Sequence, residues 1–284
     1  DPQEYGGFSL LDEQEKAEII DLVFGEDGLK VGLVKMFLDP WHQEKAKGPF
    51  DHERSTQNMR AFVKAGLDKT KARGANLSII TTLYGPPPFM TQQKFLRGRD
   101  FDPTMKNELC NYYVDWAKYL DTNGFPIKYI SLHNEGEDWS RWPSDGKSGN
   151  IGEGHDYNMY WPTDLINEMI TSVRKGLDKE GLNQVGVTNG ENTNWYRFMN
   201  WGYAYGLYDN DKALSNLDLV TSHGFYYGFI GTRWYGDHES SGIDLIREKR
   251  PDMKAWVTST SWGKMDTYFV TEMQGNIYTS KVNG

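Results

Sequence analysis

Apolar residues along the chain fall into two kinds of segment: short continuous runs, and longer stretches at helical spacing. The short runs predict strands of a parallel sheet that is covered on both faces. They lie at residues 31–38, 77–83, 127–132, 185–188, 217–221 and 255–258, and a weaker strand is expected around Gly6 and Gly7. The longer stretches predict helices at residues 12–24, 56–73, 103–122, 162–180, 195–206, 243–249 and 267–282. Strand and helix therefore alternate along the chain.

The predicted helix at 162–180 has the clearest amphipathic pattern. Its apolar residues recur three and four positions apart, which places them on one helical face. They are Leu165, Ile166, Met169, Ile170, Val173 and Leu177. Pro162 stands at the expected start of this helix and Pro103 at the start of the helix at 103–122, where the missing N–H costs nothing.

Repeated strand–helix units predict an α/β fold with a parallel sheet, either doubly wound or closed into a (β/α)8 TIM barrel. Neither a Gly-x-Gly-x-x-Gly motif after the first strand nor a Gly-x-x-x-x-Gly-Lys-Ser/Thr motif occurs, so the doubly wound alternative lacks its usual nucleotide-binding loop. Polar and aromatic clusters follow almost every predicted strand, and in a barrel these clusters meet on one face. The pattern therefore favours the barrel.

Seven strands and seven helices are expected, and we expect the eighth strand of the barrel to lie beyond residue 284. We found no linker or low-complexity tract, so residues 1–284 are expected to form a single catalytic barrel domain. The sequence begins at Asp1 without a signal peptide, and the expectation is that a leader was removed or the sequence trimmed.

Composition narrows the possible partners. The net charge is −9, which argues against nucleic acid and against an anionic membrane surface. Cys110 is the single cysteine, so an intramolecular disulfide and a cysteine-based zinc site are excluded. Aromatic residues make up 14% of the chain, with 10 Trp, and sugars stack their apolar C–H faces on such rings. Packing in the core is the alternative role for about half of these rings.

The sharpest chemical signal is the segment YISLHNEGE at 129–137, in which a strand runs directly into Asn134 and Glu135. A carboxylic acid at a rigid strand end, beside a hydrogen-bonding amide, suits general acid catalysis. Partial burial would raise the pKa of such a carboxyl group. An Asn-Glu turn on the surface is the alternative interpretation.

Asn-Glu at the end of the fourth predicted strand resembles the acid/base site of the retaining glycoside hydrolases of clan A. Three further segments resemble glycoside hydrolase family 30: YGGFS at 5–9 with VFGEDGLKVGLVK at 23–35, IITTLYGPPPFM at 79–90, and KAWVT at 254–258. The resemblance extends over nearly the whole chain. Lys35 stands where family 30 usually has Arg, and this departure is more similar to the related galactocerebrosidase family.

The resemblance implies that Glu135 is the acid/base and that the nucleophile belongs at Ser259, where the clan has Glu. Retaining hydrolysis needs two carboxylates about 5–5.5 Å apart. A serine hydroxyl without an activating base cannot replace one of them, so the chain is expected to be nearly inactive. One explanation is an engineered Glu→Ser replacement. The other is natural loss or relocation of the nucleophile, with Glu137, Glu191, Asp266 and Glu272 as weaker substitutes.

Further substrate-binding residues follow from the resemblance and from position after strands. Asn134 would bind the hydroxyl next to the anomeric carbon, and His223 or Tyr226 would contact the nucleophile or the sugar. Tyr84 would wall the pocket, and Glu191 would bind sugar hydroxyls or orient the acid. Candidate sugar platforms are Trp41, Trp139, Trp195 and Trp262. Core packing or a solvated loop position is the alternative for each.

Basic residues also occur in the loops after the strands, where they suit sulfate or uronate groups. They are Arg97, Arg99, Arg141, Arg197, Arg233 and Lys264. Ordinary solvated charge is the alternative, and a charged polysaccharide stays open as a substrate class.

The sequence therefore predicts a retaining β-glycoside hydrolase that acts on an oligo- or polysaccharide by double displacement, without cofactor or metal. We expect a secreted or periplasmic monomer whose partner is a β-glycan, charged or neutral, and not nucleic acid or membrane. One alternative is a naturally inactive carbohydrate-binding protein on a degenerate barrel. Another is an unrelated barrel enzyme that uses Glu135 with a metal or a further carboxylate.

Overall fold

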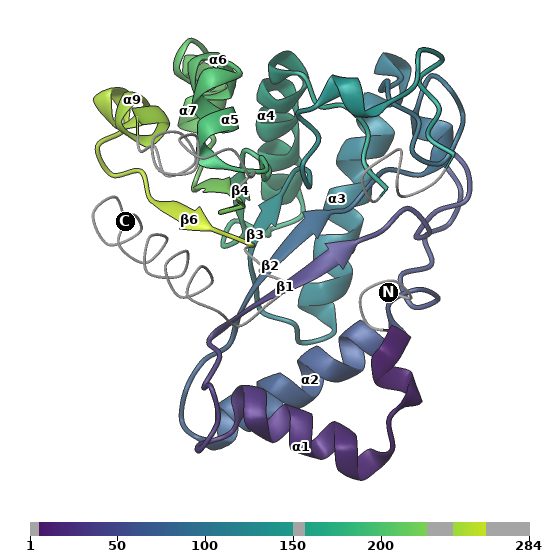
Figure 1. The fold of residues 1–284 in the computed structure, drawn as a ribbon, viewed down its shortest axis with the longest axis vertical. Coiled ribbons are helices and arrows are strands. Elements are labelled where there is room, and N and C mark those ends of the chain that lie inside the picture. Colours follow the sequence, from purple (N-terminus) through teal and green to yellow (C-terminus); the bar gives the residue numbers. More distant parts are fainter. Residues whose placement is uncertain (1–5, 150–156, 226–240, 260–284) are drawn as a thin grey trace, which may run out of the picture.

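Six parallel strands form the inner layer of the computed structural model, which describes residues 6–149, 157–225 and 241–259 (Figure 1). They are β1 (Leu33–Leu38), β2 (Ser78–Leu83), β3 (Ile127–Ser131), β4 (Gly186–Thr188), β5 (Val220–Ser222) and β6 (Ala255–Val257). The first four pair in chain order, and β5 pairs with β6. Parallel bridges from Thr188 to Leu219 and from Asn192 to Ser222 connect β4 with β5. The strands therefore form one arc, a partial (β/α) barrel.

Helices follow the strands along the chain. They are α1 (Glu13–Phe24), α2 (Gln57–Ala72), α3 (Lys106–Thr122), α4 (Thr163–Lys179), α5 (Trp195–Asn200), α6 (Tyr203–Tyr208), α7 (Asp211–Ser215) and α9 (Ser241–Lys249). Short 3-10 helices lie at Gly6–Leu10, Pro88–Met90, Pro103–Met105 and Trp139–Arg141. In Figure 1, α3 and α4 lie behind the sheet, on its outer face. The alternation predicted from the sequence is confirmed.

The outer face of the sheet is covered by the apolar sides of α3 and α4. All six residues that gave 162–180 its helical pattern are buried in α4. Trp116 of α3 is fully buried, and its indole Nε1–H donates to Thr81 Oγ1 of β2 at 2.8 Å. This bond satisfies the polar atom of a large core side chain, as burial requires.

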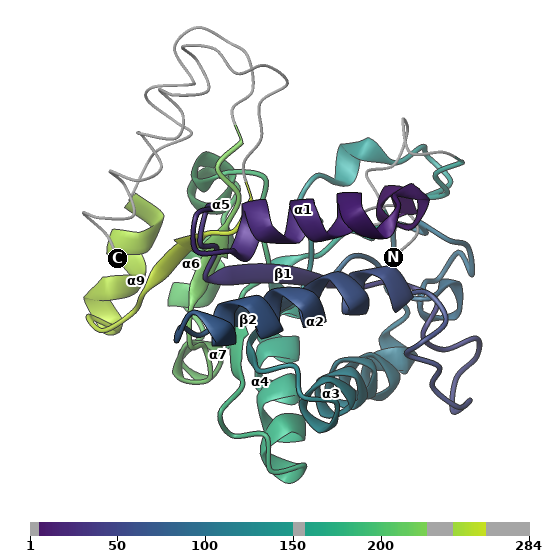
Figure 2. The ribbon, with the colours of Figure 1, turned by 90° about the horizontal axis from the view of Figure 1, so that it is seen from below.

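The first two helices lie side by side next to β1, as both ribbon views show (Figure 2). Ile20 and Phe24 of α1 form a small second core with Leu77, and the Phe24 ring lies 5.5 Å from that of Phe62 in α2. Asp12 caps α1 in a capping box with Glu15, which satisfies free N–H groups at the start of the helix.

Two sequence expectations were wrong. Gly6 and Gly7 lie in a 3-10 helix rather than a strand, because the adjacent Phe8 turns inward and packs edge-on against Phe62. The helix predicted at 195–206 is split into α5 and α6 by Gly202, whose φ of +87° is left-handed. The following α7 was not predicted. The helix expected at 267–282 lies outside the described residues.

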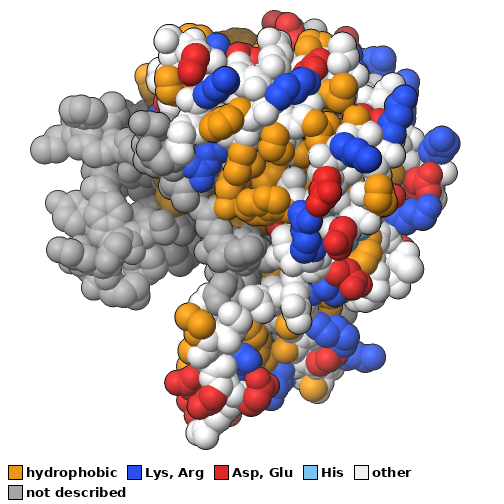
Figure 3. All heavy atoms as spheres, turned by 90° about the vertical axis from the view of Figure 1, so that its right-hand side faces the viewer, with side chains coloured by type: hydrophobic (Ala, Val, Ile, Leu, Met, Phe, Trp, Pro, Cys, Tyr) orange, Lys and Arg blue, Asp and Glu red, His pale blue; other side chains and the backbone are white. Residues whose placement is uncertain are grey.

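Basic and acidic side chains are intermingled over the part of the surface that Figure 3 describes. Within the described ranges, no helix is long and apolar enough to cross a membrane.

Gly190, just after β4, has a φ of +90°, and a Cβ there would lie 2.2 Å from His133 Cδ2. Replacing Gly190 by Ala should therefore lower the free energy of unfolding by about 2–4 kcal/mol, through backbone strain and overpacking. Urea denaturation measures the change. Gly124→Ala is the matched control, because Gly124 has a φ of +77° but no atom near its Cβ position; it should cost about 1 kcal/mol. Equal losses in the two variants would contradict the proposed packing.

Candidate active site

The turn after β3 brings Glu135 and Glu191 next to each other. Parallel pairing continues past the strands as a bridge between Asn134 and Glu191. Glu135 N–H donates to Glu191 O at 2.7 Å, and Glu191 N–H donates to His133 O at 2.8 Å. Glu135 has a φ of +49°, in the left-handed region that non-glycine residues rarely adopt. The backbone therefore fixes both carboxylates at the carboxyl ends of neighbouring strands.

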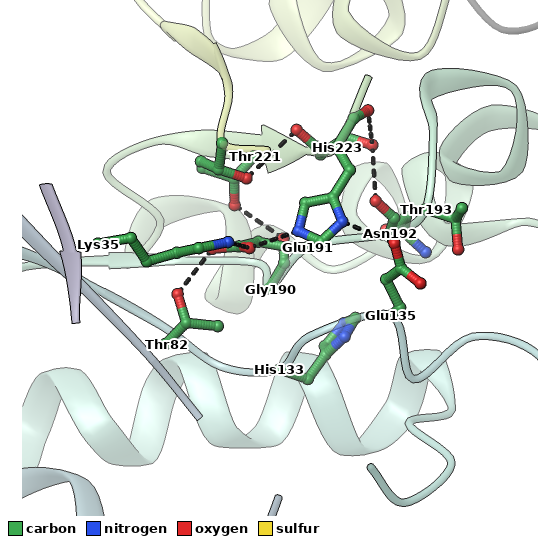
Figure 4. A network of polar contacts seen from close by, with 12 residues as sticks. Lys35, Thr82, His133, Glu135, Gly190, Glu191, Asn192, Thr193, Thr221 and His223 are labelled. Carbon is green, nitrogen blue, oxygen red and sulfur yellow. Dashed lines mark hydrogen bonds and ion pairs between the residues drawn. The ribbon is translucent and has the colours of Figure 1, made fainter. Parts of the chain in front are cut away.

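His223, which follows β5, lies between these two carboxylates (Figure 4). Its Nδ1 is 2.8 Å from Glu135 Oε1, and its Nε2 is 2.7 Å from Glu191 Oε2. A neutral imidazole has one N–H donor. Two such contacts therefore require an additional proton, either on the imidazole or on one of the carboxyl groups.

Lys35 of β1 and Thr82 of β2 determine which carboxyl group stays ionised. Lys35 Nζ donates to Glu191 Oε2 at 2.8 Å, and Thr82 Oγ1 donates to Glu191 Oε1 at 2.7 Å. Glu191 is 0% exposed. Because the ammonium group and the hydroxyl both stabilise the ionised form of Glu191, the additional proton is shared between His223 and Glu135.

The pKa shifts agree with this arrangement. Burial would raise the pKa of Glu191, but Lys35 and His223 together hold it well below its usual range. Burial and Lys35 lower the pKa of His223, yet the hydrogen bonds to Glu135 and Glu191 outweigh them and raise it. His133 is buried against the ring of Trp161, and burial lowers its pKa to about 3. His133 is therefore neutral, and the shared proton lies between His223 and Glu135.

Glu135 has further partners on the side away from His223. Asn158 Nδ2 donates to Glu135 O at 3.2 Å, and Arg141 Nη1 lies 3.5 Å from Glu135 Oε2. Arg141 belongs to the 3-10 helix that follows Glu135 along the chain, and its Nε lies 3.7 Å from Asp138. The 3-10 helix thus brings a cation to the edge of the Glu135 carboxylate.

The carboxylate of Glu137, one of the weaker substitutes for the nucleophile, contacts groups other than Glu135. Glu137 Oε1 accepts from Thr193 N at 3.0 Å and lies 3.0 Å from Arg197 Nη1. Glu137 is buried, and these contacts hold it against the residues that follow β4. Asp266 and Glu272, the other weak substitutes, lie outside the described residues.

Ser259, two residues beyond β6, lies beside the residue that follows His223. Gly224 N–H donates to Ser259 O at 2.8 Å, and Thr258 N–H donates to Ser222 O at 3.0 Å. The ladder between β5 and β6 thus extends to Ser259, whose side chain is half-buried. The position that the resemblance assigns to the nucleophile is at the same edge of the barrel as Glu135.

The expected aromatic platforms differ widely in exposure. Tyr84 is buried, with its ring 4.4 Å from that of Phe37, and Trp41 lies edge-on to Tyr157 at 4.7 Å. Trp139 is 50% exposed, whereas Trp195 is 2% exposed and packs against Phe198 in the core. Tyr226 and Trp262 lie outside the described residues. Trp139 is therefore the most exposed of the expected platforms in the described ranges.

Several of the expected basic residues interact with groups of the protein itself. Arg99 pairs with Asp100, Arg197 pairs with Glu137, and Arg97 lies over the ring of Tyr157 at 5.3 Å. These contacts use charge that a sulfate or uronate group would otherwise require. Arg233 and Lys264 lie outside the described residues.

No protein-family model matches the sequence, and no curated protein matches it either. Solved structures match at the level of fold. The endo-β1,6-glucanase BT3312 matches with a TM-score of 0.73 and 13% identity, and the match covers 98% of this chain and 60% of the glucanase chain. A conserved exported protein from Bacteroides fragilis matches with a TM-score of 0.72 and 13% identity, covering 95% of this chain and 64% of that protein. The family 30 subfamily 8 xylanase Xyn30A from Clostridium acetobutylicum matches with a TM-score of 0.62 and 14% identity, covering 93% of this chain and 57% of the xylanase.

The fold is that of the family 30 glycoside hydrolases of clan A. The chain spans about three-fifths of the length of these similar structures. The partial barrel described above agrees with this fold, and the fold expected from the four sequence segments is confirmed.

Two contacts of the network in this partial barrel were not predicted from the sequence. Lys35 was noted as a departure from the usual Arg but not as a partner of Glu191, and Thr82 was not singled out. A signal for Lys35 was present, because a lysine inside the apolar run LVKMFL requires a buried counter-ion. Thr82, in a buried strand that already contains Thr81, carried no comparable signal.

Removing the cation from Glu191 tests the network's effect on stability. Lys35→Met should lower the free energy of unfolding by about 3–5 kcal/mol, because a fully buried carboxylate loses its ammonium partner. The matched control is Lys64→Met, which removes a solvent-exposed pair with Asp68 and should cost under about 1 kcal/mol. Urea denaturation at neutral pH measures both. A loss at Lys35 no larger than at Lys64 would contradict the pairing.

His223 also predicts a pH dependence. Its pKa is raised above 6.5 in the folded state, so its contribution to stability is complete below pH 6.5 and is lost as the pH rises through the folded pKa. The pKa values of His133 and His42 are lowered in the folded state, so their contribution to the pH dependence has the opposite sign, and it is common to the parent chain and a His223→Gln variant. The free energy of unfolding of the parent minus that of His223→Gln should therefore fall as the pH rises above 6.5. Urea denaturation at several pH values measures this difference, and a difference that does not fall would contradict the assignment.

Proposed function

We propose that the chain is built for retaining hydrolysis of a β-glycan, with Glu135 as the acid/base. The observation that carries the proposal is the buried hydrogen bond between His223 and Glu135, at the carboxyl edge of a barrel with the family 30 fold. Active sites of such barrels lie at this edge. The bond shares a proton, so Glu135 can take either form.

Glu135 would act twice. As a carboxylic acid it would protonate the glycosidic oxygen as the bond to the leaving group breaks. As a carboxylate it would then accept a proton from the attacking water. His223 holds the proton next to Glu135 Oε1, and Glu191 stays ionised beside Lys35, so the proton moves within one hydrogen bond. Asn134, buried at the same strand end, would bind the hydroxyl next to the anomeric carbon.

The first displacement needs a carboxylate at position 259, and Ser259 does not supply one. Glu191 is not a substitute, because Lys35, Thr82 and His223 bind both of its carboxylate oxygens. A nucleophile needs a carboxylate oxygen that can bond to the anomeric carbon, so a carboxylate held in this way is not expected to take that role. The chain with Ser259 is therefore expected to have little hydrolytic activity, whether the serine is natural or introduced.

The names of the similar structures guide the choice of substrates. One is an endo-β1,6-glucanase and one is a xylanase, so a polysaccharide or a long oligosaccharide is the proposed substrate. Secretion or a periplasmic location fits such a substrate and agrees with the exported protein among the similar structures. We propose that the protein acts as a monomer without a cofactor.

A naturally inactive carbohydrate-binding protein is the second candidate function. Ser259 favours it, because the charge network around Glu191 is complete without a carboxylate at that position. On this alternative the barrel would hold a glycan at the same edge without cleaving it.

Restoring the nucleophile distinguishes the two candidates. Ser259→Glu should raise the rate of hydrolysis of at least one β-glycan by at least about 10³-fold, because double displacement again has two carboxylates. The measurement is reducing-sugar release from a panel of neutral and acidic β-glycans.

Two variants control this experiment. In Ser259→Gln the new side chain has the length of Glu without its charge, so the rate of hydrolysis should stay as low as that of the parent chain with Ser259. Adding Glu135→Gln to Ser259→Glu should abolish the gain. If the folded Ser259→Glu variant cleaves none of the panel while the Ser259 chain binds glycans, the hydrolase proposal fails and the binding function is supported.

A further inference from the structure

A pocket of 410 Å³ lies between the starts of α3 and α4, next to the loop that follows Glu135. Its lining includes the rings of Trp139, Tyr160 and Phe101, together with Gln92 and Asp164. The volume is in the range of small-molecule sites, which combine apolar walls with a few polar groups. We name it the Trp139 pocket.

Trp139 is held rigidly although it is half-exposed. It begins a 3-10 helix that Asp138 caps, with Asp138 Oδ1 accepting from Ser140 N at 3.2 Å and from Ser140 Oγ at 2.6 Å. The Arg99 guanidinium lies 4.1 Å from the centroid of the Trp139 ring, and two hydrogen bonds to Asp100 fix it there. An exposed ring fixed in this way binds a ligand with a small loss of conformational entropy.

The same loop connects the pocket to the acid/base. Trp139 and Arg141 belong to one 3-10 helix, and Arg141 lies 3.5 Å from Glu135 Oε2. Trp161 N–H donates to Gly136 O at 2.7 Å, and Tyr160 N–H donates to Arg99 O at 2.8 Å. The segment that supplies the pocket wall is thus bonded to the backbone next to Glu135.

The charges that line the pocket favour an uncharged ligand. Three lining residues carry carboxylates: Asp100, Asp164 and Glu168. Among the lining residues that the structure describes, Lys106 alone carries an ammonium group, and it is paired with Glu168. A sulfated sugar or a uronate would meet net negative charge, which is unfavourable. A neutral sugar would place its C–H face on an aromatic ring and its hydroxyl groups against Gln92 and the carboxylates.

We infer that the Trp139 pocket is an outer subsite for a neutral glycan whose reacting unit lies at Glu135. The inference rests on the proposed function for its class of ligand, and it narrows that class from any β-glycan to an uncharged one. Oligosaccharides long enough to occupy both places should bind more tightly than disaccharides.

The chain with Ser259 is suited to the test, because it should bind substrates without consuming them. Isothermal titration with neutral xylohexaose, xylobiose, a β1,6-linked glucohexaose and a β1,4-linked mannuronate hexamer would give affinities for long, short and acidic β-linked ligands. Trp139→Ala should weaken binding of a neutral hexamer about fivefold to tenfold. Trp139→Phe should retain most of the affinity, and no variant should alter binding of xylobiose.

Trp201 gives the matched control. It is 42% exposed and lies under Arg197 at 4.2 Å, much as Trp139 lies under Arg99, but it does not line the pocket. Trp201→Ala should leave binding of the hexamers unchanged. In ¹H–¹⁵N spectra, the indole signal that disappears in Trp139→Phe should shift when a neutral hexamer is added.

The outcomes separate the subsite from the proposed function. Equal affinity of the Trp139→Ala variant and the parent chain would overturn the subsite. Tighter binding of the mannuronate hexamer than of the neutral hexamers would overturn the neutral class. Hydrolysis by Ser259→Glu without any effect of Trp139→Ala on the hexamers would leave the function standing and the subsite refuted. Absence of both hydrolysis and binding would refute both.

Discussion

The structure depends on the neutralisation of charge around a fully buried carboxylate. Glu191 has no access to solvent, so its ionised form exists only because Lys35, Thr82 and His223 contact it. An isolated buried carboxylate would be highly unfavourable. These partners come from β1, β2 and the residues just after β5, so the ends of separate strands have to meet within hydrogen-bond distance. The requirement constrains the register of the sheet more strictly than apolar packing could.

The same constraint places the proton that catalysis would use. With Glu191 ionised, the second contact of His223 shares its proton with Glu135. Lys35, Glu191, His223 and Glu135 then carry two positive and two negative charges when the imidazole is protonated. This balance does not involve position 259. Serine there leaves no buried cation without a counter-ion, so the barrel can fold around the site while lacking a nucleophile.

Local patterns in the sequence were sufficient to predict the strands, most helices and the strand end that carries Glu135. Apolar runs and helical spacing determine these elements over a few residues, as the burial of α4 illustrates. The Lys35–Glu191 contact joins residues 156 positions apart, and a single sequence contains no pattern that specifies it. The 3-10 helix at Gly6–Leu10 and the break at Gly202 depend on tertiary packing and on one left-handed residue. Neither the 3-10 helix nor the break leaves a mark in the spacing of apolar residues, so the sequence pattern did not predict them.

The tryptophans show why position after a strand is a weaker guide to function than exposure. Trp139 and Trp195 both follow strands, and the sequence favoured both as sugar platforms. Trp195 begins α5, and its ring lies in the core against Phe198. Trp139 begins a 3-10 helix whose other end approaches Glu135, and Arg99 holds its ring at the surface. The first ring stabilises the barrel, whereas the second has surface that a ligand can cover. The distinction depends on the loop between β3 and α4, which also brings Arg141 to Glu135, so the proposed acid/base and the proposed outer subsite share one element of the fold.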